Sequence, residues 1–114
     1  MHPIAELRKI CLSLPGAKEV ETWDQPTFRV NNKMFAISTS DTDPEHRVTV
    51  KAPPGEQRIL LETGHPFFLP SYVGSKGWIG ILLDDDSDWS EVAELVEDSY
   101  RLIAPKRLIA ELDA

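Results

Sequence analysis

The chain has 114 residues, of which 41% are hydrophobic and 27% are charged. This length and composition are typical of one globular domain with a packed core, and they argue against a disordered chain. The longest apolar stretches, such as residues 79–83, are far shorter than the roughly 18–20 residues that cross a bilayer. The N-terminus also lacks the basic start and continuous apolar stretch of a secretion signal. We therefore expect a single domain over residues 1–114, located in the cytoplasm and without a membrane span.

The formal net charge of −7 is distributed unevenly along the chain. After residue 82, three cations face ten carboxylates, whereas the preceding residues are neutral overall. Binding to nucleic acid usually requires a basic stripe, so the placement of the cations matters more than their total. The sequence alone does not tell whether they share one face. The single cysteine, Cys11, lies on the apolar side of the first predicted helix, which indicates a structural thiol.

Apolar periodicity and turn residues predict the elements in chain order. A helix is predicted over residues 3–14, where apolar residues recur every three or four positions before Pro15-Gly16. Between two β-rich runs, the pair Asn31-Asn32 tolerates the positive φ of a tight hairpin turn. The predicted strands are residues 18–23, 27–30, 33–39, 47–51 and 78–83.

Three further helices are predicted around an irregular segment. Residues 56–63 precede a glycine stop, and Asp88 with Glu91 forms a variant of the capping box before a long amphipathic helix. Pro105 opens a short last helix. Residues 65–77 hold several glycine and proline breaks and are expected to form an apolar loop. Together the elements predict an α+β two-layer sandwich, with helices on one face of an antiparallel sheet and the other face open to solvent or a partner.

Motifs for metal binding and catalysis do not occur at the required spacings. The three histidines have no second ligand nearby, and the aspartates from Asp84 to Asp88 lack the glycine and glutamate of a calcium loop. The sequence Gly74-Ser75-Lys76-Gly77 lacks the spacing of a phosphate-binding loop, and no nucleophile motif is found. We therefore expect no metal site, no cofactor and no catalytic residue.

Cations and aromatic residues alternate through the predicted sheet. The cations could contact phosphates, and the aromatic rings could stack on bases or fill a groove. The simpler interpretation from composition alone is that the rings belong to the core and the cations are solvated. This group comprises Phe28, Arg29, Lys33, Phe35, Arg47, Lys51, Tyr72, Lys76 and Trp78.

Several segments across nearly the whole chain resemble the MmcQ/YjbR family. They are weak individually, but their order and spacing are specific. The segments are residues 14–17 (LPGA) with Glu19, 28–30 (FRV), 33–36 (KMFA), 48–51 (VTVK), 72–74 (YVG) with Gly77-Trp78, 98–102 (DSYRL) and 106–107 (KR).

This resemblance implies a CyaY-like fold, related in shape to the frataxins, and DNA binding through a double wing of hairpins. The wings would be the hairpin at Asn31-Asn32 and the region from Arg47 to Lys51. Frataxins carry acidic ridges on the first helix, whereas the acidic excess here follows residue 83, so iron binding is not carried over. The phosphate contacts expected on this basis are Arg29, Lys33, Arg47, Lys51 and Lys76.

Two hypotheses for function follow, from different classes. The first is a non-enzymatic module that binds double-stranded DNA through its backbone. The alternative is a module that binds a protein or a small ligand on the exposed sheet face, at a groove around Tyr72 and Trp78. An enzyme ranks third, since no nucleophile and base are recognisable.

Overall fold

The computed structural model describes residues 2–114 and shows one six-stranded sheet with all helices packed around it. Every neighbouring pair of strands is antiparallel, in the order β1-β2-β3-β4-β6-β5. The strands are β1 (Lys18–Thr22), β2 (Gln25–Val30), β3 (Lys33–Ser38), β4 (His46–Lys51), β5 (Phe67–Phe68) and β6 (Trp78–Leu83). The helices are α1 (Pro3–Leu12), α2 (Glu56–Thr63), the 3-10 helix η1 (Val73–Lys76), α3 (Trp89–Ile103) and α4 (Lys106–Asp113).

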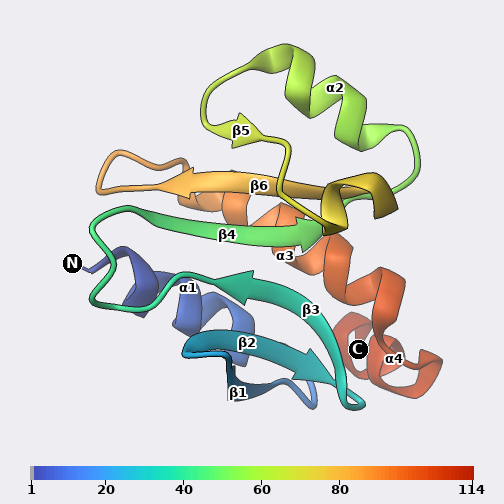
Figure 1. The fold of residues 1–114 in the computed structure, drawn as a ribbon. Helices are drawn as coiled ribbons and strands as arrows, with labels where there is room; N and C mark the ends of the chain where they lie inside the picture. Colours follow the sequence, from blue (N-terminus) through green and yellow to red (C-terminus); the bar gives the residue numbers. More distant parts are fainter. Residues whose placement is uncertain (1) are drawn as a thin grey trace.

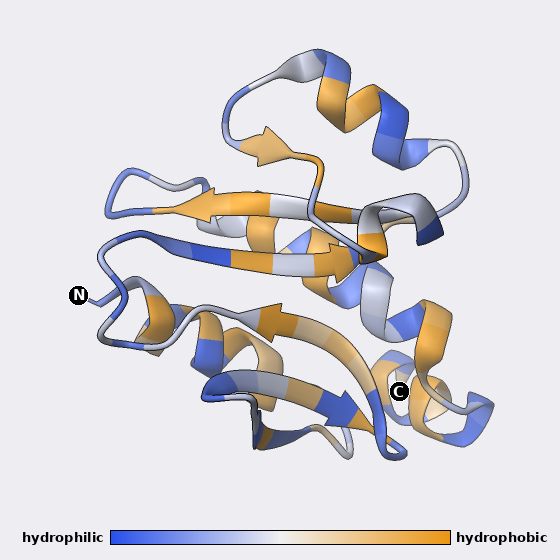
Figure 2. Ribbon diagram, viewed as in Figure 1, coloured by the Kyte–Doolittle hydropathy of each residue, from blue (hydrophilic) through white to orange (hydrophobic). Residues whose placement is uncertain are grey.

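Helices α1 and α3 lie behind the sheet in the view of Figure 1, and the segment that leads from β5 to η1 crosses in front of it. Alternate residues of the central strands, such as Val48, Val50, Ile79 and Ile81, are buried between these layers. Strand β6 is largely hydrophobic, while the turns at both ends of the sheet are hydrophilic (Figure 2). The prediction of an α+β fold with an antiparallel sheet is therefore confirmed.

Two tight turns connect the first three strands. Asn31 and Asn32 have φ angles of 50° and 65°, as expected for a two-residue hairpin turn. Trp23 and Asp24 have φ angles of 54° and 62° and form a similar turn, which the sequence prediction missed because it extended the strand to Trp23. A bulky side chain is rare in this conformation, so periodicity alone gives little warning of the turn.

The segment 65–77, predicted as a loop, contains regular structure in part. Strand β5 pairs with β6, and the ring of Phe68 lies over Gly80, where any side chain would collide with it. The glycine in β6 therefore makes room for the edge strand, a relation between residues far apart in sequence. The first helix also ends at Leu12 rather than Leu14, because Ser13 adopts the capping position.

Helix α3 is joined to the sheet by a buried hydroxyl group. The pairing of β2 with β3 shifts between Phe28 and Arg29, and Phe35 has no partner in this ladder. The hydroxyl group of Ser99 donates to the Phe35 carbonyl oxygen at 2.7 Å and accepts from the Lys51 amide at 3.0 Å. One side chain from the helix layer thus satisfies backbone groups on both β3 and β4.

Candidate functional site

The antiparallel pairing gathers cations at one end of the sheet. Lys18 lies directly opposite Arg29, Val30 opposite Lys33, and Lys51 opposite Trp78. Lys76 is the last residue of η1 and lies two positions before Trp78, the first residue of β6. Arg107 of α4 lines a pocket together with Lys18 and Arg29. We call this group the basic end; its members are Lys18, Arg29, Lys33, Lys51, Lys76 and Arg107.

Carboxylates gather in the turns at the opposite end of the sheet. This acidic end comprises Asp24 between β1 and β2, the β3–β4 loop, and the turn that leads from β6 into α3. Because six-residue strands separate the two ends, the distance between them is roughly 17–20 Å. The carboxylates of the acidic end are Asp24, Asp41, Asp43, Glu45, Asp84, Asp85, Asp86 and Asp88.

The two ends also differ in the pairing of their charges. Five of the twelve lysines and arginines form ion pairs with carboxylates: Arg8, Lys9, Arg47, Arg58 and Arg101. Among residues 2–114, the other seven have no carboxylate within ion-pair distance. These seven are the six residues of the basic end and Lys106, the neighbour of Arg107.

Four of the five predicted phosphate contacts lie at the basic end. Arg29, Lys33, Lys51 and Lys76 lie at or beside the strand ends there, whereas Arg47 lies toward the acidic end. The Arg47 guanidinium is 3.8 Å from a Glu45 carboxylate oxygen and 5.8 Å from the centre of the Phe68 ring. Arg47 therefore already has a carboxylate and an aromatic partner.

The second predicted wing, from Arg47 to Lys51, is not a projecting hairpin. It forms strand β4, which runs through the sheet between β3 and β6. The β2–β3 hairpin, by contrast, projects at the lower right of Figure 1, with Asn31 and Asn32 at its tip. The double wing implied by the resemblance is therefore not confirmed.

Two cations of the basic end were missed by sequence reasoning. Lys18 could have been found from the turn at Trp23-Asp24, because a two-residue turn there places residue 18 opposite Arg29. Arg107 has no comparable signal, since it depends on how α4 folds back toward β1 and β2. The Leu108 side chain packs against Gly16 at this point.

Arg29 is held in place by neutral partners. Its Nε donates to the Thr27 hydroxyl at 3.3 Å, and its Nη2 donates to the Thr22 hydroxyl at 3.1 Å. The Thr27 hydroxyl in turn donates to the Val20 carbonyl oxygen at 2.5 Å. These contacts fix the guanidinium without neutralising it, so its positive charge stays available to an external anion.

Of the two aromatic residues predicted to line a groove, Tyr72 lines one and Trp78 does not. Tyr72 is 94% exposed and lines a groove of about 430 Å³ on the open sheet face, together with Arg47, Thr49 and Phe68. Trp78 is only 9% exposed and is not among the residues that line this groove. Its carbonyl oxygen accepts a 2.6 Å hydrogen bond from the Gln57 amide.

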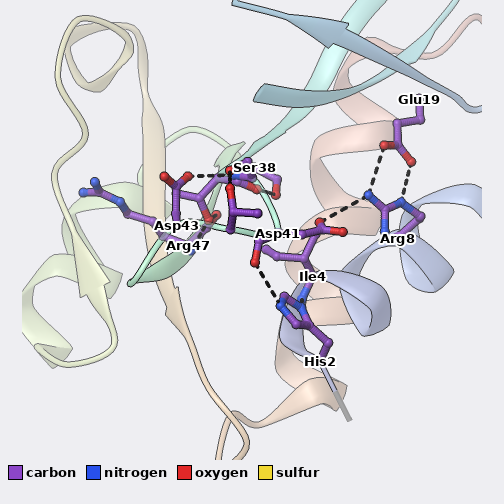
Figure 3. Close-up of polar contacts among 11 residues, drawn as sticks. His2, Ile4, Arg8, Glu19, Ser38, Asp41, Asp43 and Arg47 are labelled. Carbon is purple, nitrogen blue, oxygen red and sulfur yellow. Dashed lines mark hydrogen bonds and ion pairs between the residues drawn. The ribbon is translucent and has the colours of Figure 1, made fainter. Parts of the chain in front are cut away.

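Near the acidic end, a polar network ties α1 to the rest of the molecule. Figure 3 shows Arg8 between Glu19 of β1 and Asp41 of the β3–β4 loop, at 2.6 Å and 3.5 Å. His2 caps α1 by accepting from the Ile4 amide, and its other ring nitrogen lies 3.1 Å from the Asp41 carbonyl oxygen. These contacts account for His2 as a structural residue.

Cys11 and the aspartates after β6 make contacts that explain them as structural residues. Cys11 is fully buried, and burial raises the pKa of its thiol, so the reactive thiolate is disfavoured. Asp84 accepts from the Asp86 amide, and Asp88 caps α3 by accepting from the Glu91 amide. Within residues 2–114, no three ligating side chains converge in a way that could hold a metal ion. None of the helices in this range is long and apolar enough to span a bilayer.

Comparisons with known proteins bear on the family and the fold. The YjbR family model matches residues 12–102. A crystal structure of a Deinococcus radiodurans protein, described as a DUF419 domain, superposes with a TM-score of 0.80 and 24% identity, covering 99% of this chain and 89% of that one. No curated protein sequence matches the chain. Since the family model spans most of the chain, from the end of α1 to the last turn of α3, the chain belongs to the YjbR family.

Proposed function

We propose that this chain is a non-enzymatic module that binds the phosphate backbone of duplex DNA with its basic end. The observation that carries the proposal is the gathering of every unpaired lysine and arginine among residues 2–114 at that end or beside it. These cations can approach phosphates without first breaking an ion pair. Each phosphate that they neutralise releases counterions, which favours binding.

The net charge of −7 does not oppose this arrangement strongly. The acidic end lies roughly two Debye lengths from the basic end at about 0.1 M salt, so its repulsion of a bound duplex is largely screened. The β2–β3 hairpin supports the proposal as a wing, because its two-residue turn is narrow and Lys33 directly follows it. Contacts of this kind position a protein on DNA without reading its sequence.

The test is a comparison of two double variants with equal charge changes. Lys33→Glu with Lys76→Glu reverses two cations of the basic end, while Lys9→Glu with Arg58→Glu reverses two cations elsewhere. Lys9 and Arg58 have 79% and 87% exposed side chains, so neither change disturbs the core. Arg29 is a poorer choice, because it also makes hydrogen bonds within the fold.

Binding of a labelled duplex is followed by fluorescence anisotropy at several salt concentrations. We expect the first double variant to bind at least tenfold more weakly, and its slope of log K against log salt to fall by about 2. The second variant should bind within about threefold of the unmodified chain. Equal weakening by both variants, or no binding by the unmodified chain at low salt, would contradict the proposal.

A second candidate function is supported by the backbone at Tyr72. This residue has φ 63° and ψ −65°, and the Val73 amide donates to the Ser71 carbonyl oxygen at 2.7 Å, which closes a strained three-residue turn. Such strain combined with a 94% exposed ring is typical of binding sites. The groove beneath it could hold a protein segment or a small ligand. Loss of a co-purifying partner from Tyr72→Ala, with DNA affinity unchanged, would favour this function.

A further inference from the structure

A small pocket within the basic end has the composition of an anion site. Its volume is about 300 Å³, and its walls come from β1, the β2–β3 hairpin, α4 and the loop before β1. Lys18, Arg29 and Arg107 line it, together with the side-chain amides of Asn31 and Asn32. Among residues 2–114, no carboxylate lines it, and none of its three cations forms an ion pair. The concavity therefore carries an excess of positive charge.

The placement of these cations is unfavourable for the protein alone. Lys18 and Arg29 are direct cross-strand partners, so their side chains leave the same face of the sheet next to each other. Like charges directly opposite each other destabilise a sheet. Arg107 approaches the same pocket from α4 and adds to the repulsion. A bound anion would convert this repulsion into attraction.

Arg29 lines the pocket, and its guanidinium is held in place by hydrogen bonds within the fold. The Thr22 and Thr27 hydroxyl groups occupy two of its five N–H groups. Among residues 2–114, no acceptor is found for the remaining three. A guanidinium fixed in this way loses little side-chain freedom when it binds a phosphate, and its fork geometry suits two phosphate oxygens.

We propose that this pocket binds a phosphomonoester, with Lys18, Arg29 and Arg107 holding the dianionic phosphate group. A terminal phosphate can enter a concavity of this size, whereas a phosphate within a duplex continues into sugars on both sides. Three cations also match a dianion better than the single charge of a phosphodiester. This inference rests on the proposed function, from which it takes phosphate as the ligand. It adds that the pocket recognises a terminal phosphate group. The source is either a free nucleotide or the phosphorylated end of a DNA strand.

Isothermal titration calorimetry with adenosine 5′-monophosphate tests the pocket directly, with adenosine and inorganic phosphate as further probes. Anisotropy with duplexes that carry either a 5′-phosphate or a 5′-hydroxyl group tests the strand end. The variants are Lys18→Gln and Arg107→Gln, and the matched controls are Lys106→Gln and Lys9→Gln, which leave the pocket lining unchanged. All four positions are exposed, and a thermal unfolding scan of each variant shows whether it folds.

We expect the nucleotide to bind and adenosine not to bind, with each pocket variant at least tenfold weaker and both controls within about twofold. Preference for the 5′-phosphorylated duplex would identify the strand end as a source, and equal binding of both duplexes would identify the free nucleotide. Absence of binding by both the nucleotide and inorganic phosphate, together with no preference between the duplexes, overturns the inference. Duplex binding that remains sensitive to Lys33 and Lys76 would in that case leave the proposed function standing. Nucleotide binding without duplex binding would reject the proposed function and support the pocket.

Discussion

The basic end and the acidic end of the sheet differ in how their charged residues are supported. At the basic end, the cations come from separate strands and helices, and Ser99 and Tyr100 of α3 make partly buried hydrogen bonds to the backbone at Lys51 and Pro15. At the acidic end, the carboxylates lie in exposed turns, where several accept hydrogen bonds from nearby backbone amides. The comparison shows that a fold can sort charges spatially even when the sequence has a large net charge of one sign. Within the basic end, Arg29 is the preorganised cation, because two hydroxyl groups hold its guanidinium.

The largest effect on stability is expected at the basic end, from Ser99→Ala. This change leaves the Phe35 carbonyl oxygen and the Lys51 amide without their shared buried partner, and each unsatisfied group carries a penalty. We expect the free energy of unfolding to fall by about 2–3 kcal/mol in urea denaturation. As a control, Ser13→Ala removes an exposed hydroxyl and should change it by less than about 0.5 kcal/mol. A cost at Ser99 as small as this control would show that β3 and β4 need no bridge from α3.

A smaller effect, with a pH dependence, is expected from Tyr100→Phe. The buried Tyr100 hydroxyl donates to the Pro15 carbonyl oxygen at 2.5 Å, beside the loop that leads to Lys18. Burial, followed by the nearby Glu111, raises the pKa of Tyr100, so the unfolded chain ionises first as pH increases. Removal of the hydroxyl group should cost about 1 kcal/mol at pH 7.

The contribution of Tyr100 to stability is then fully present below about pH 10 and is lost as the pH rises further, whereas the variant lacks this contribution and should lose less stability. The Cys11 thiol, whose pKa is also raised by burial, contributes equally to both proteins, so their difference isolates Tyr100. Denaturation at pH 7, 9 and 10.5 measures this difference. Parallel pH profiles for the two proteins would refute the assignment.

At the acidic end, Asp88→Ala tests the start of α3. The Asp88 carboxylate accepts from the Glu91 amide at 3.1 Å, and this cap is exposed. Its loss should lower the free energy of unfolding by about 1 kcal/mol, less than the loss of Ser99. A cost larger than that of Ser99→Ala would reverse the comparison of the two ends.

The smallest effect is expected when Asp84, Asp85 and Asp86 are all changed to Asn. The free energy of unfolding should change by less than about 0.5 kcal/mol, because asparagine retains an acceptor for the turn. Affinity for a duplex at about 0.1 M salt should rise by no more than about threefold, since the turn lies beyond the range of unscreened repulsion. Anisotropy measures this rise, and a tenfold increase would show that the two ends are not electrostatically separate.

Much of the fold was predictable because its signals are local. The Asn31-Asn32 turn, the strand from Trp78 to Leu83 and the Asp88 cap are each encoded within a few residues. Strand β5 was missed because its position depends on Gly80, which leaves space for the Phe68 ring. The β1–β2 turn was missed because Trp23 is an unusual residue for a positive φ.

The site was predictable only in part, because it depends on the register of the strands and on the packing of α4 against the loop before β1. The sequence identified Arg29, Lys33, Lys51 and Lys76 as cations of interest, and the pairing of the strands brings them to one end. Arg47 and Lys51 lie near opposite ends of β4. Arg47 therefore has an acidic neighbour, Glu45, whereas Lys51 belongs to the basic end. Arg107 reaches the pocket through packing of Leu108 on Gly16, which no local pattern indicates.

The weak attachment of helix α4 should allow it to open locally while the rest of the domain stays folded. It follows the extended residues Ala104 and Pro105, and it is held by Leu108 and by the exposed Arg101–Asp113 pair, in which Arg101 lowers the pKa of Asp113. Elements with so few buried contacts open locally far more often than the whole domain unfolds. Amide protons of α4 should therefore exchange with deuterium sooner than those of α3. Because each opening removes Arg107 from its pocket, an occupied pocket should slow that exchange.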